Sequence, residues 1–356
     1  MMKICVFNPE HDLALAANLS NFTAPHAGRQ LRADLGYLPA LWATDGDYVL
    51  VDNVEDAERR YRILMRRPFG RFLTKEMLHG HGYAFTSVDV WGWDRAIRAF
   101  LLRYGVSASV MPSVDEIDVI RDLSHRRQAV DLLSRLQMSG TIGRSFVLEN
   151  LEEVTKKLDE FGQIVVKAPW SSSGRGVRFI EQQLNNYHEG WIRNVMERQG
   201  CVIVEPYYNK VKDFGMEFES DGMGQVRYLG LSLFQTKNGA YMGNIIASEE
   251  VKEEMLSHYI PVSLFYSVQQ SICNYLGTLY AHRYKGCFGV DMMIVRRDAG
   301  HGFLLHPCVE INLRRTMGHT ALSIPPYADG LTRVMRIELT DKYRMRITSF
   351  VQSQTS

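Results

Sequence analysis

The sequence predicts an α/β protein that begins with a parallel sheet and continues into a region of α+β character. Two short apolar runs, Lys3–Phe7 and Tyr48–Val51, flank a segment of mixed polarity at His26–Trp42. That order is typical of a strand, a crossover helix and a second parallel strand. Beyond Ser145 the pattern changes to short strand-like runs separated by turns. With about 150 residues per domain as a guide, a chain of 356 residues is expected to form two or three domains.

The composition excludes several classes of protein. Hydrophobic residues make up 46% and charged residues 23% of the chain, so it can bury a core and is too apolar to be disordered. Lysine and arginine number 41 against 40 acidic residues, a net charge of +1. No bulk charge marks a binder of nucleic acid or of an anionic membrane. We therefore expect neither as a partner.

Cysteine usage and hydropathy predict a cytoplasmic protein. The N-terminus carries Glu10, His11 and Asp12 where a secretory signal would need an apolar stretch. No run approaches the roughly 18 consecutive apolar residues of a membrane span. None of the cysteines has the paired spacing of a zinc site or a disulfide framework, so we expect reduced thiols at all five positions: Cys5, Cys201, Cys273, Cys287 and Cys308.

The turn after the first expected strand has no dinucleotide-binding fingerprint. The turn after the first strand, Asn8–Asp12, lacks the glycines that let a backbone approach a pyrophosphate. Arginines crowd the segment 58–75. They are typical of a solvated helical face. The alternative is a site for an anionic substrate or for nucleic acid, and the near-zero net charge argues against nucleic acid. Residues 115–137 are expected to be mainly helical, and the first domain to end near residue 120.

The second region alternates strands and helices. A helix is expected from about Leu256 to Tyr280, and a polar, frayed tail after Arg346. The expected strands are Ile164–Lys167, Arg178–Ile180, Val202–Glu205, Gly215–Glu219, Val226–Phe234, Phe288–Val295 and Phe303–Asn312.

Two strand ends in this region could meet a nucleotide. The run ending at Lys167 leads into a loop of small residues, Ser171–Gly176, whose amides and hydroxyls could cradle a polyphosphate next to the lysine. A Ser/Gly turn without a ligand has the same composition. A second strand ends at Glu205, followed by Asp213, and these acids could contact a purine edge and a ribose. Taken alone, this segment is better explained by a strand-end acid in solvent.

A hairpin further along could hold a metal ion. If Ala299–Gly302 is a four-residue loop, Asp291 lies directly opposite Glu310, and Asn312 shares a face with Glu310. Two opposed carboxylates repel each other without a counter-ion. Oxygen ligands of this kind suit Mg²⁺, although a register slip of one residue would separate them. Arg314 follows and could hold a phosphoryl oxygen or a carboxylate.

These motifs together resemble the ATP-grasp superfamily in order and spacing, over roughly residues 120–330. The resemblance implies a Rossmann-like N-terminal domain (1–120) and then an ATP-grasp fold of two α+β lobes (121–210 and 211–346). The polar composition of the last residues predicts a polar tail (347–356). The motifs that carry it are the Lys167 strand with its Ser/Gly loop, the segment Glu205–Tyr208, the strand Gly289–Asp291 and the pattern Glu310-x-Asn312-x-Arg314.

Carried over motif by motif, the resemblance assigns ATP-binding residues. Lys167 resembles the family's phosphate-binding lysine, Glu205 the acid that meets the adenine amino group, Tyr208 a backbone amide donor and Asp213 the ribose contact. Asp213 is shorter than the glutamate usual there. The family's flexible loop would correspond to Ser171, Ser172, Ser173, Gly174 and Gly176.

The resemblance also implies a metal site and a catalytic arginine. Asp291, Glu310 and Asn312 resemble the ligands of Mg²⁺, with Mn²⁺ as a substitute, and Arg314 resembles the arginine near the transferred phosphoryl group. A further lysine, usual near the start of the central domain, is replaced in this neighbourhood by Arg126 and Arg127, which are imperfectly spaced.

The implied function is an ATP-dependent carboxylate–amine ligase that works through an acyl phosphate. Two alternatives stay open: phosphoryl transfer to a hydroxyl, and a nucleotide-binding protein without catalysis. The expected partners are a small carboxylate and an amine, and the resemblance admits a homodimer. Substrate contacts are the least defined feature of the sequence, and the candidates are Glu10, His11, Asp12, Lys237, Arg315 and His319.

Overall fold

The computed structural model describes residues 2–65, 69–80, 82–171, 176–237, 240–297, 302–327 and 330–350, except for the side chains of residues 236, 237 and 240. The chain divides into two compact units. The first contains residues 1–121, 243–247 and 314–356, and the second contains residues 122–242 and 248–313. The predicted large lobe, 211–346, is thus divided between them.

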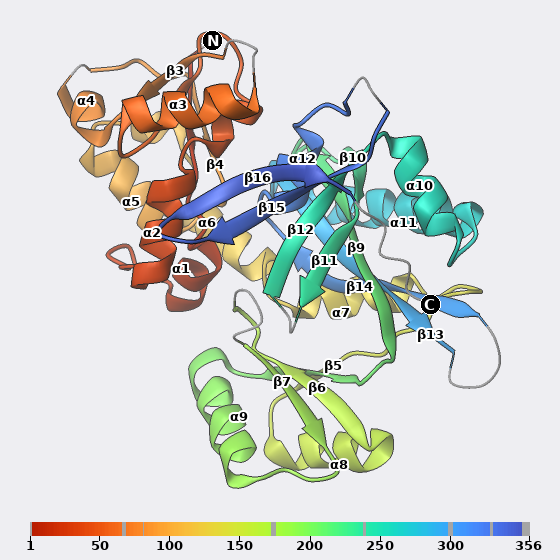
Figure 1. Ribbon diagram of the computed structural model, residues 1–356. Helices are drawn as coiled ribbons and strands as arrows, with labels where there is room; N and C mark the ends of the chain where they lie inside the picture. Colours follow the sequence, from red (N-terminus) through yellow and green to blue (C-terminus); the bar gives the residue numbers. More distant parts are fainter. Residues whose placement is uncertain are drawn as a thin grey trace. The chain divides into compact units, whose positions relative to one another are not determined.

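The first unit is built on the parallel sheet that the sequence predicts. Its strands lie in the order β3–β2–β1–β4, and every neighbouring pair is parallel. The strands, coloured red to orange in Figure 1, are β1 (Lys3–Val6), β2 (Tyr48–Leu50), β3 (Arg71–Leu73) and β4 (Ser87–Val90). The helices between and after them are α1 (His11–Ala17), α2 (His26–Leu35), the 3-10 helix η1 (Leu38–Leu41), α3 (Val54–Leu64), α4 (Lys75–Gly80), α5 (Arg95–Arg103), the 3-10 helix η2 (Ala108–Val110) and α6 (Val114–Leu123).

Distant segments complete this unit. The C-terminal strands β15 (Arg333–Leu339) and β16 (Tyr343–Ser349) form an antiparallel hairpin, and β15 pairs with the end of β12 (Ala240–Ile246). Met335 and Met345 pack into the same core as the first sheet, as does Ile324, which follows α12 (Met317–Leu322). The expected polar tail is therefore wrong for residues 347–349, which belong to β16 because they pair with β15.

The second unit contains two antiparallel sheets. One has the order β5–β8–β6–β7, with α8 and α9 packed on it, and the other has the order β10–β9–β13–β14, contacted by α7, α10 and α11. The first group is α7 (Arg127–Arg135), β5 (Phe146–Leu148), α8 (Leu151–Phe161), β6 (Gln163–Lys167), β7 (Val177–Glu181), α9 (Asn186–Gln199) and β8 (Val202–Pro206). The second is β9 (Lys210–Ser220), β10 (Val226–Ser232), β11 (Phe234–Lys237), α10 (Glu249–Ser257), α11 (Val262–Tyr280), β13 (Gly286–Arg296) and β14 (Phe303–Asn312).

Local chemistry sets the ends of these elements. Asn150 caps α8 by accepting a hydrogen bond from the backbone of Glu153 at 2.9 Å, and Gly162 ends the helix with a φ of 72° that favours glycine. The five cysteines are unpaired thiols, as expected. Among the described residues, no helix is both long and apolar enough to cross a bilayer.

Candidate nucleotide and metal site

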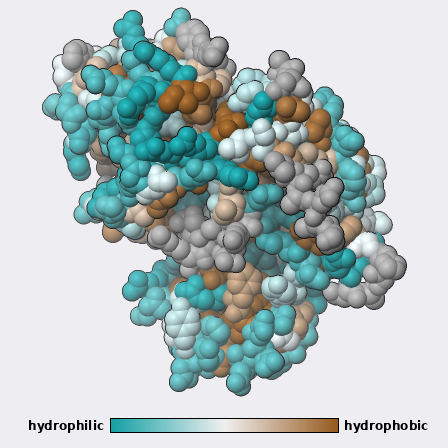
Figure 2. Space-filling view, in the orientation of Figure 1, coloured by the Kyte–Doolittle hydropathy of each residue, from teal (hydrophilic) through white to brown (hydrophobic). Residues whose placement is uncertain are grey.

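The helix-free face of the sheet β5–β8–β6–β7 carries the predicted nucleotide-binding side chains. Ile180 packs in the core under α8 and α9, so Phe179, its neighbour on β7, points to the opposite face, where it is 63% exposed. Val165 pairs with Phe179 on one side and with Glu205 on the other. Apolar residues gather where Figure 1 shows β6 and β7 (Figure 2). This face offers apolar surface beside polar groups, as a base-binding surface does.

Lys167 and Glu205 form a buried ion pair on this face. Lys167 Nζ lies 2.7 Å from Glu205 Oε2, and each side chain is less than one-tenth exposed. Ser145 Oγ donates to the other oxygen of Glu205 at 3.1 Å, and Lys167 Nζ also donates to the carbonyl of Val309 at 3.2 Å. The lysine thereby links β6 to β14, next to the predicted metal ligands.

The ends of the Ser/Gly loop are held together. The amide of Ala168 donates to the carbonyl of Gly176 at 2.8 Å, which continues the pairing of β6 with β7. A Cβ at Gly176 would lie 2.2 Å from Ser171 Oγ, so this close approach requires glycine. The predicted loop residues Ser172, Ser173 and Gly174 lie outside the described residues.

Two other predicted nucleotide contacts have partners within the unit. The backbone amide of Tyr208 is the predicted contact, whereas the bond that the structure shows is made by its hydroxyl, which accepts from the amide of Arg144 at 2.9 Å; burial raises the pKa of Tyr208 to about 12. Asp213 on β9 pairs with Lys210 at 2.6 Å.

The hairpin β13–β14 places the predicted metal ligands side by side. Asp291 lies directly opposite Glu310, and Asn312 Nδ2 donates to Asp291 Oδ2 at 2.9 Å. On the other side of Asp291, β9 contributes Gly215, where a Cβ would lie 3.2 Å from Asp291 Oδ1. The missing side chain leaves room for the carboxylate of Asp291.

The predicted turn of this hairpin is wrong in its register. Near the turn, Arg296 pairs with Phe303, and the register then shifts by two residues before Asp291 meets Glu310. Met292 is therefore opposed by the longer stretch 307–309 of β14. Pro307 has no amide to donate to a ladder, which favours a bulge at this point. The loop 299–302 itself lies mostly outside the described residues.

Sequence reasoning left Arg126 undecided, and the structure connects it to this site. Its guanidinium donates to Glu310 Oε1 at 2.6 Å and to Ser171 Oγ at 2.7 Å. Burial was the deciding information, because in sequence Arg126 and Arg127 are equivalent.

His306 on β14 is a residue that the sequence did not single out. It is fully buried, with its ring edge-on to Tyr208 at 5.4 Å between centroids. Burial lowers the pKa of His306 to about 4, with Glu205 opposing this effect and Lys167 adding to it. No pattern in the sequence distinguishes it from an ordinary strand residue.

The predicted catalytic arginine and most of the predicted substrate contacts lie in the first unit. Arg314 makes a two-pronged ion pair with Asp12, at 2.8 and 2.7 Å. Arg315 pairs with Asp89 at 2.9 Å and lies over the ring of Trp42.

The remaining substrate candidates have structural partners as well. Glu10 pairs with Arg32 at 2.9 Å, and the buried His11 contacts Asp94 at 3.0 Å. His319 is buried and closes a capping box at the start of α12. Lys237 ends β11, but its side chain is not described.

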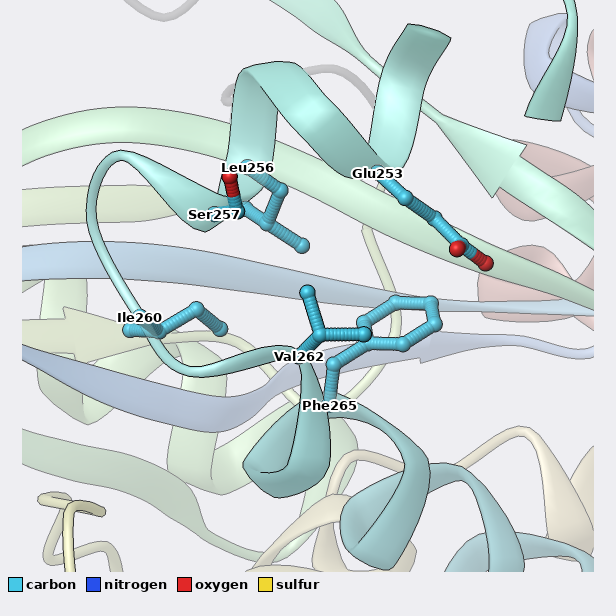
Figure 3. A pocket seen from close by; sticks show the side chains of 6 residues that line it. All are labelled: Glu253, Leu256, Ser257, Ile260, Val262 and Phe265. Carbon is cyan, nitrogen blue, oxygen red and sulfur yellow. The ribbon is translucent and has the colours of Figure 1, made fainter. Parts of the chain in front are cut away.

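A recess elsewhere in the second unit contains none of these residues. It lies between α10 and α11 and is lined mainly by apolar side chains (Figure 3). Glu253, which lines it, accepts a hydrogen bond from Tyr266 at 2.8 Å, so this carboxylate already has a partner within the protein.

Comparisons with solved structures identify the fold. The biotin carboxylase domain of the 2-oxoglutarate carboxylase of Hydrogenobacter thermophilus, in complex with MgADP, ADP and bicarbonate, matches 94% of this chain and 74% of its own. The TM-score is 0.50 and the identity is 12%. The chain has an ATP-grasp fold.

An N5-carboxyaminoimidazole synthetase from Staphylococcus aureus, complexed with ADP, matches 95% of the chain and 82% of its own, with 13% identity and a TM-score of 0.47. No family model and no curated protein matches the sequence. Identities this low establish the ATP-grasp fold alone, so the reaction has to be argued from the residues.

Proposed function

We propose that the chain is an ATP- and Mg²⁺-dependent ligase that joins a carboxylate to an amine-type nucleophile through an acyl phosphate and releases ADP and phosphate. The observation that carries this proposal is the connection between two predicted half-sites in one unit. Lys167, paired with Glu205, donates to the residue just before Glu310, and Glu310 faces Asp291. Cationic and anionic groups for a metal–triphosphate complex are thereby concentrated in one place.

The residues present fit a magnesium site. Mg²⁺ is usually bound through one or two carboxylates together with substrate phosphates and water. Asp291 and Glu310 supply two such carboxylates. The described ranges contain no group of three or more His, Cys, Asp or Glu side chains suited to a metal, so the remaining ligands would have to come from Asn312, the substrate phosphates and water. Asn312 would add its amide oxygen after a half-turn of the amide, whose orientation is not fixed by the heavy atoms. Mn²⁺ suits the same oxygen ligands.

The side chains of the protein would position the substrates and neutralise the charge of the phosphates, and none of them would act as the nucleophile. An oxygen of the substrate carboxylate attacks the γ-phosphorus, the bond to the bridging oxygen breaks, and ADP leaves. The amine nitrogen then attacks the acyl carbon, phosphate leaves, and the amine loses a proton to solvent. Bound Mg²⁺ supplies charge neutralisation on the phosphates. Lys167 would hold a phosphate oxygen, and Glu205 would accept from the adenine amino group.

Arg314 is the proposed contact of the transferred phosphoryl group. The two-pronged pair with Asp12 fixes the plane of its guanidinium, so a further anion would meet an oriented donor. Glu10, His11, Asp12, Lys237, Arg315 and His319 remain proposed substrate contacts.

The test is ADP release, screened against amino acids, short peptides and polyamines, with product masses. The variant Glu310→Gln should lower turnover by about a hundredfold or more, because the proposed Mg²⁺ site loses one of its two carboxylates and with it the charge neutralisation at the phosphates. Glu219→Gln is the matched control, since Glu219 lies in the same sheet, on β9, but pairs with Arg227 at the surface. Full ADP release by the Glu310 variant would refute the assignment, and a phosphorylated product without condensation would reassign the reaction to phosphoryl transfer.

A further inference from the structure

Arg126 is a buried arginine whose side chain touches both predicted half-sites. It is 7% exposed and lies just before α7. One terminal nitrogen donates to Glu310 Oε1 at 2.6 Å, and the other donates to Ser171 Oγ at 2.7 Å and to the carbonyl of Ala168. Its own amide donates to the carbonyl of Pro169 at 3.2 Å, which ties the backbone to the same segment.

One donor of this guanidinium has no described acceptor. The Nε of Arg126 is buried and makes no hydrogen bond to any residue within the described ranges. A buried N–H without an acceptor costs about 1–3 kcal/mol, so such groups usually meet a further ligand or a water molecule. The side chain therefore has capacity for one more acceptor beside Glu310 and Ser171.

The adjacent arginine shows that this arrangement is specific to one position. Arg127 has a side chain that is 44% exposed and pairs with Asp122. Both arginines carry the same charge, but only Arg126 contacts Glu310. Arg127 thus provides a matched control for charge in the same segment.

We propose that Arg126 forms an ion pair with the carboxylate of Glu310 while no nucleotide is bound. When a nucleoside triphosphate or diphosphate binds with a divalent cation, Glu310 binds the cation and Arg126 pairs with phosphate oxygens of the nucleotide instead. This inference rests on the proposed ATP site. A guanidinium donates to carboxylate and phosphate oxygens alike, so a phosphate oxygen can replace Glu310 Oε1 as the acceptor of its terminal nitrogen. If a cation bound Glu310 without a nucleotide, the buried guanidinium of Arg126 would lose its counter-charge, which is costly.

The consequence is positive coupling between metal and nucleotide. Nucleotide-free protein should bind a divalent cation weakly, because Arg126 holds Glu310. A phosphate that receives Arg126 frees Glu310 for the metal, and by linkage the metal strengthens nucleotide binding by the same factor. Mg²⁺ would then enter as a complex with nucleotide rather than on its own.

Calorimetric titration of Mn²⁺ alone, and of MgADP, tests this on the full chain. Arg126→Met should raise the affinity for Mn²⁺ alone by about fivefold or more and lower the affinity for MgADP by about tenfold or more, within the usual range of coupling between sites. Arg127→Met should change neither. In the double variant Arg126→Met/Glu310→Gln the gain in Mn²⁺ affinity should disappear, because Glu310 is the group that Arg126 releases.

Unchanged Mn²⁺ affinity in Arg126→Met, or a gain that persists in the double variant, would overturn the exchange. Circular dichroism and a melting curve verify that each variant is folded. If Arg126→Met does not fold, Arg126→Gln replaces it, since a neutral amide likewise removes the counter-charge of Glu310, and an unchanged Mn²⁺ affinity in that variant counts equally against the inference. Wild-type protein that fails to bind MgADP would refute the proposed ATP site and the phosphate half of the exchange, whereas the competition for Glu310 is decided by the Mn²⁺ titrations alone.

Discussion

His306 should make the folded protein sensitive to mild acid. Its ring is fully buried, and neither ring nitrogen has a hydrogen-bond partner among the described residues. Gly143 packs against the ring so closely that a Cβ there would lie 2.8 Å from Nε2. A proton added to this ring would therefore place an unsolvated charge in a site without room to rearrange.

The size of the effect follows from the pKa. Burial lowers the pKa of His306 to about 4 in the folded chain, whereas the unfolded chain has the ordinary value of about 6.5. The unfolded state takes up the proton first, so the stability contributed by neutral His306 is complete above about pH 6.5 and is lost as the pH falls toward 4. Between about pH 7.5 and about pH 5 this removes about 2 kcal/mol from the free energy of unfolding.

Urea unfolding of wild type and of His306→Leu at both pH values measures this loss. The leucine variant lacks the titrating group, so the stability difference between the two proteins should shift by about 2 kcal/mol in favour of the variant on acidification. His258→Gln, at an exposed histidine, is the control and should keep the wild-type pH dependence. Equal pH dependence of His306→Leu and wild type would refute the reasoning, because His306 would then be protonated as easily in the folded chain as in the unfolded one.

Two further variants test contacts in the separate units by urea unfolding. Gly92→Ala would place a Cβ within 2.4 Å of the buried His11 ring, and the overpacking should cost about 1–3 kcal/mol; wild-type stability would show that the ring can move aside. Lys252→Met leaves the partly buried Glu249, paired at 2.7 Å, without its cation and should cost about 2–3 kcal/mol. Lys156→Met, which breaks an exposed pair, is its control and should cause no measurable loss; equal losses in both lysine variants would contradict the role given to burial.

Hydrophobic periodicity determined much of the fold from the sequence alone. The first two strands form the expected parallel pair, because apolar runs buried on both faces need a helical crossover between them. The strand ends at Lys167 and Glu205 were found in the same way, since a charged residue that follows an apolar run marks where a buried strand reaches polar surroundings. The alternation of side chains along β14 likewise placed Glu310 and Asn312 on one face.

Only the tertiary structure decided which charges meet. Arg126 and Arg127 are equivalent in sequence, and burial alone separates the one that contacts Glu310 from the one that faces solvent. Arg314 forms an ion pair with Asp12, a residue 302 positions earlier, because the C-terminal segment folds into the first unit. Local patterns define elements, whereas the pairing of distant charges depends on how those elements pack, and no short segment of sequence contains that information.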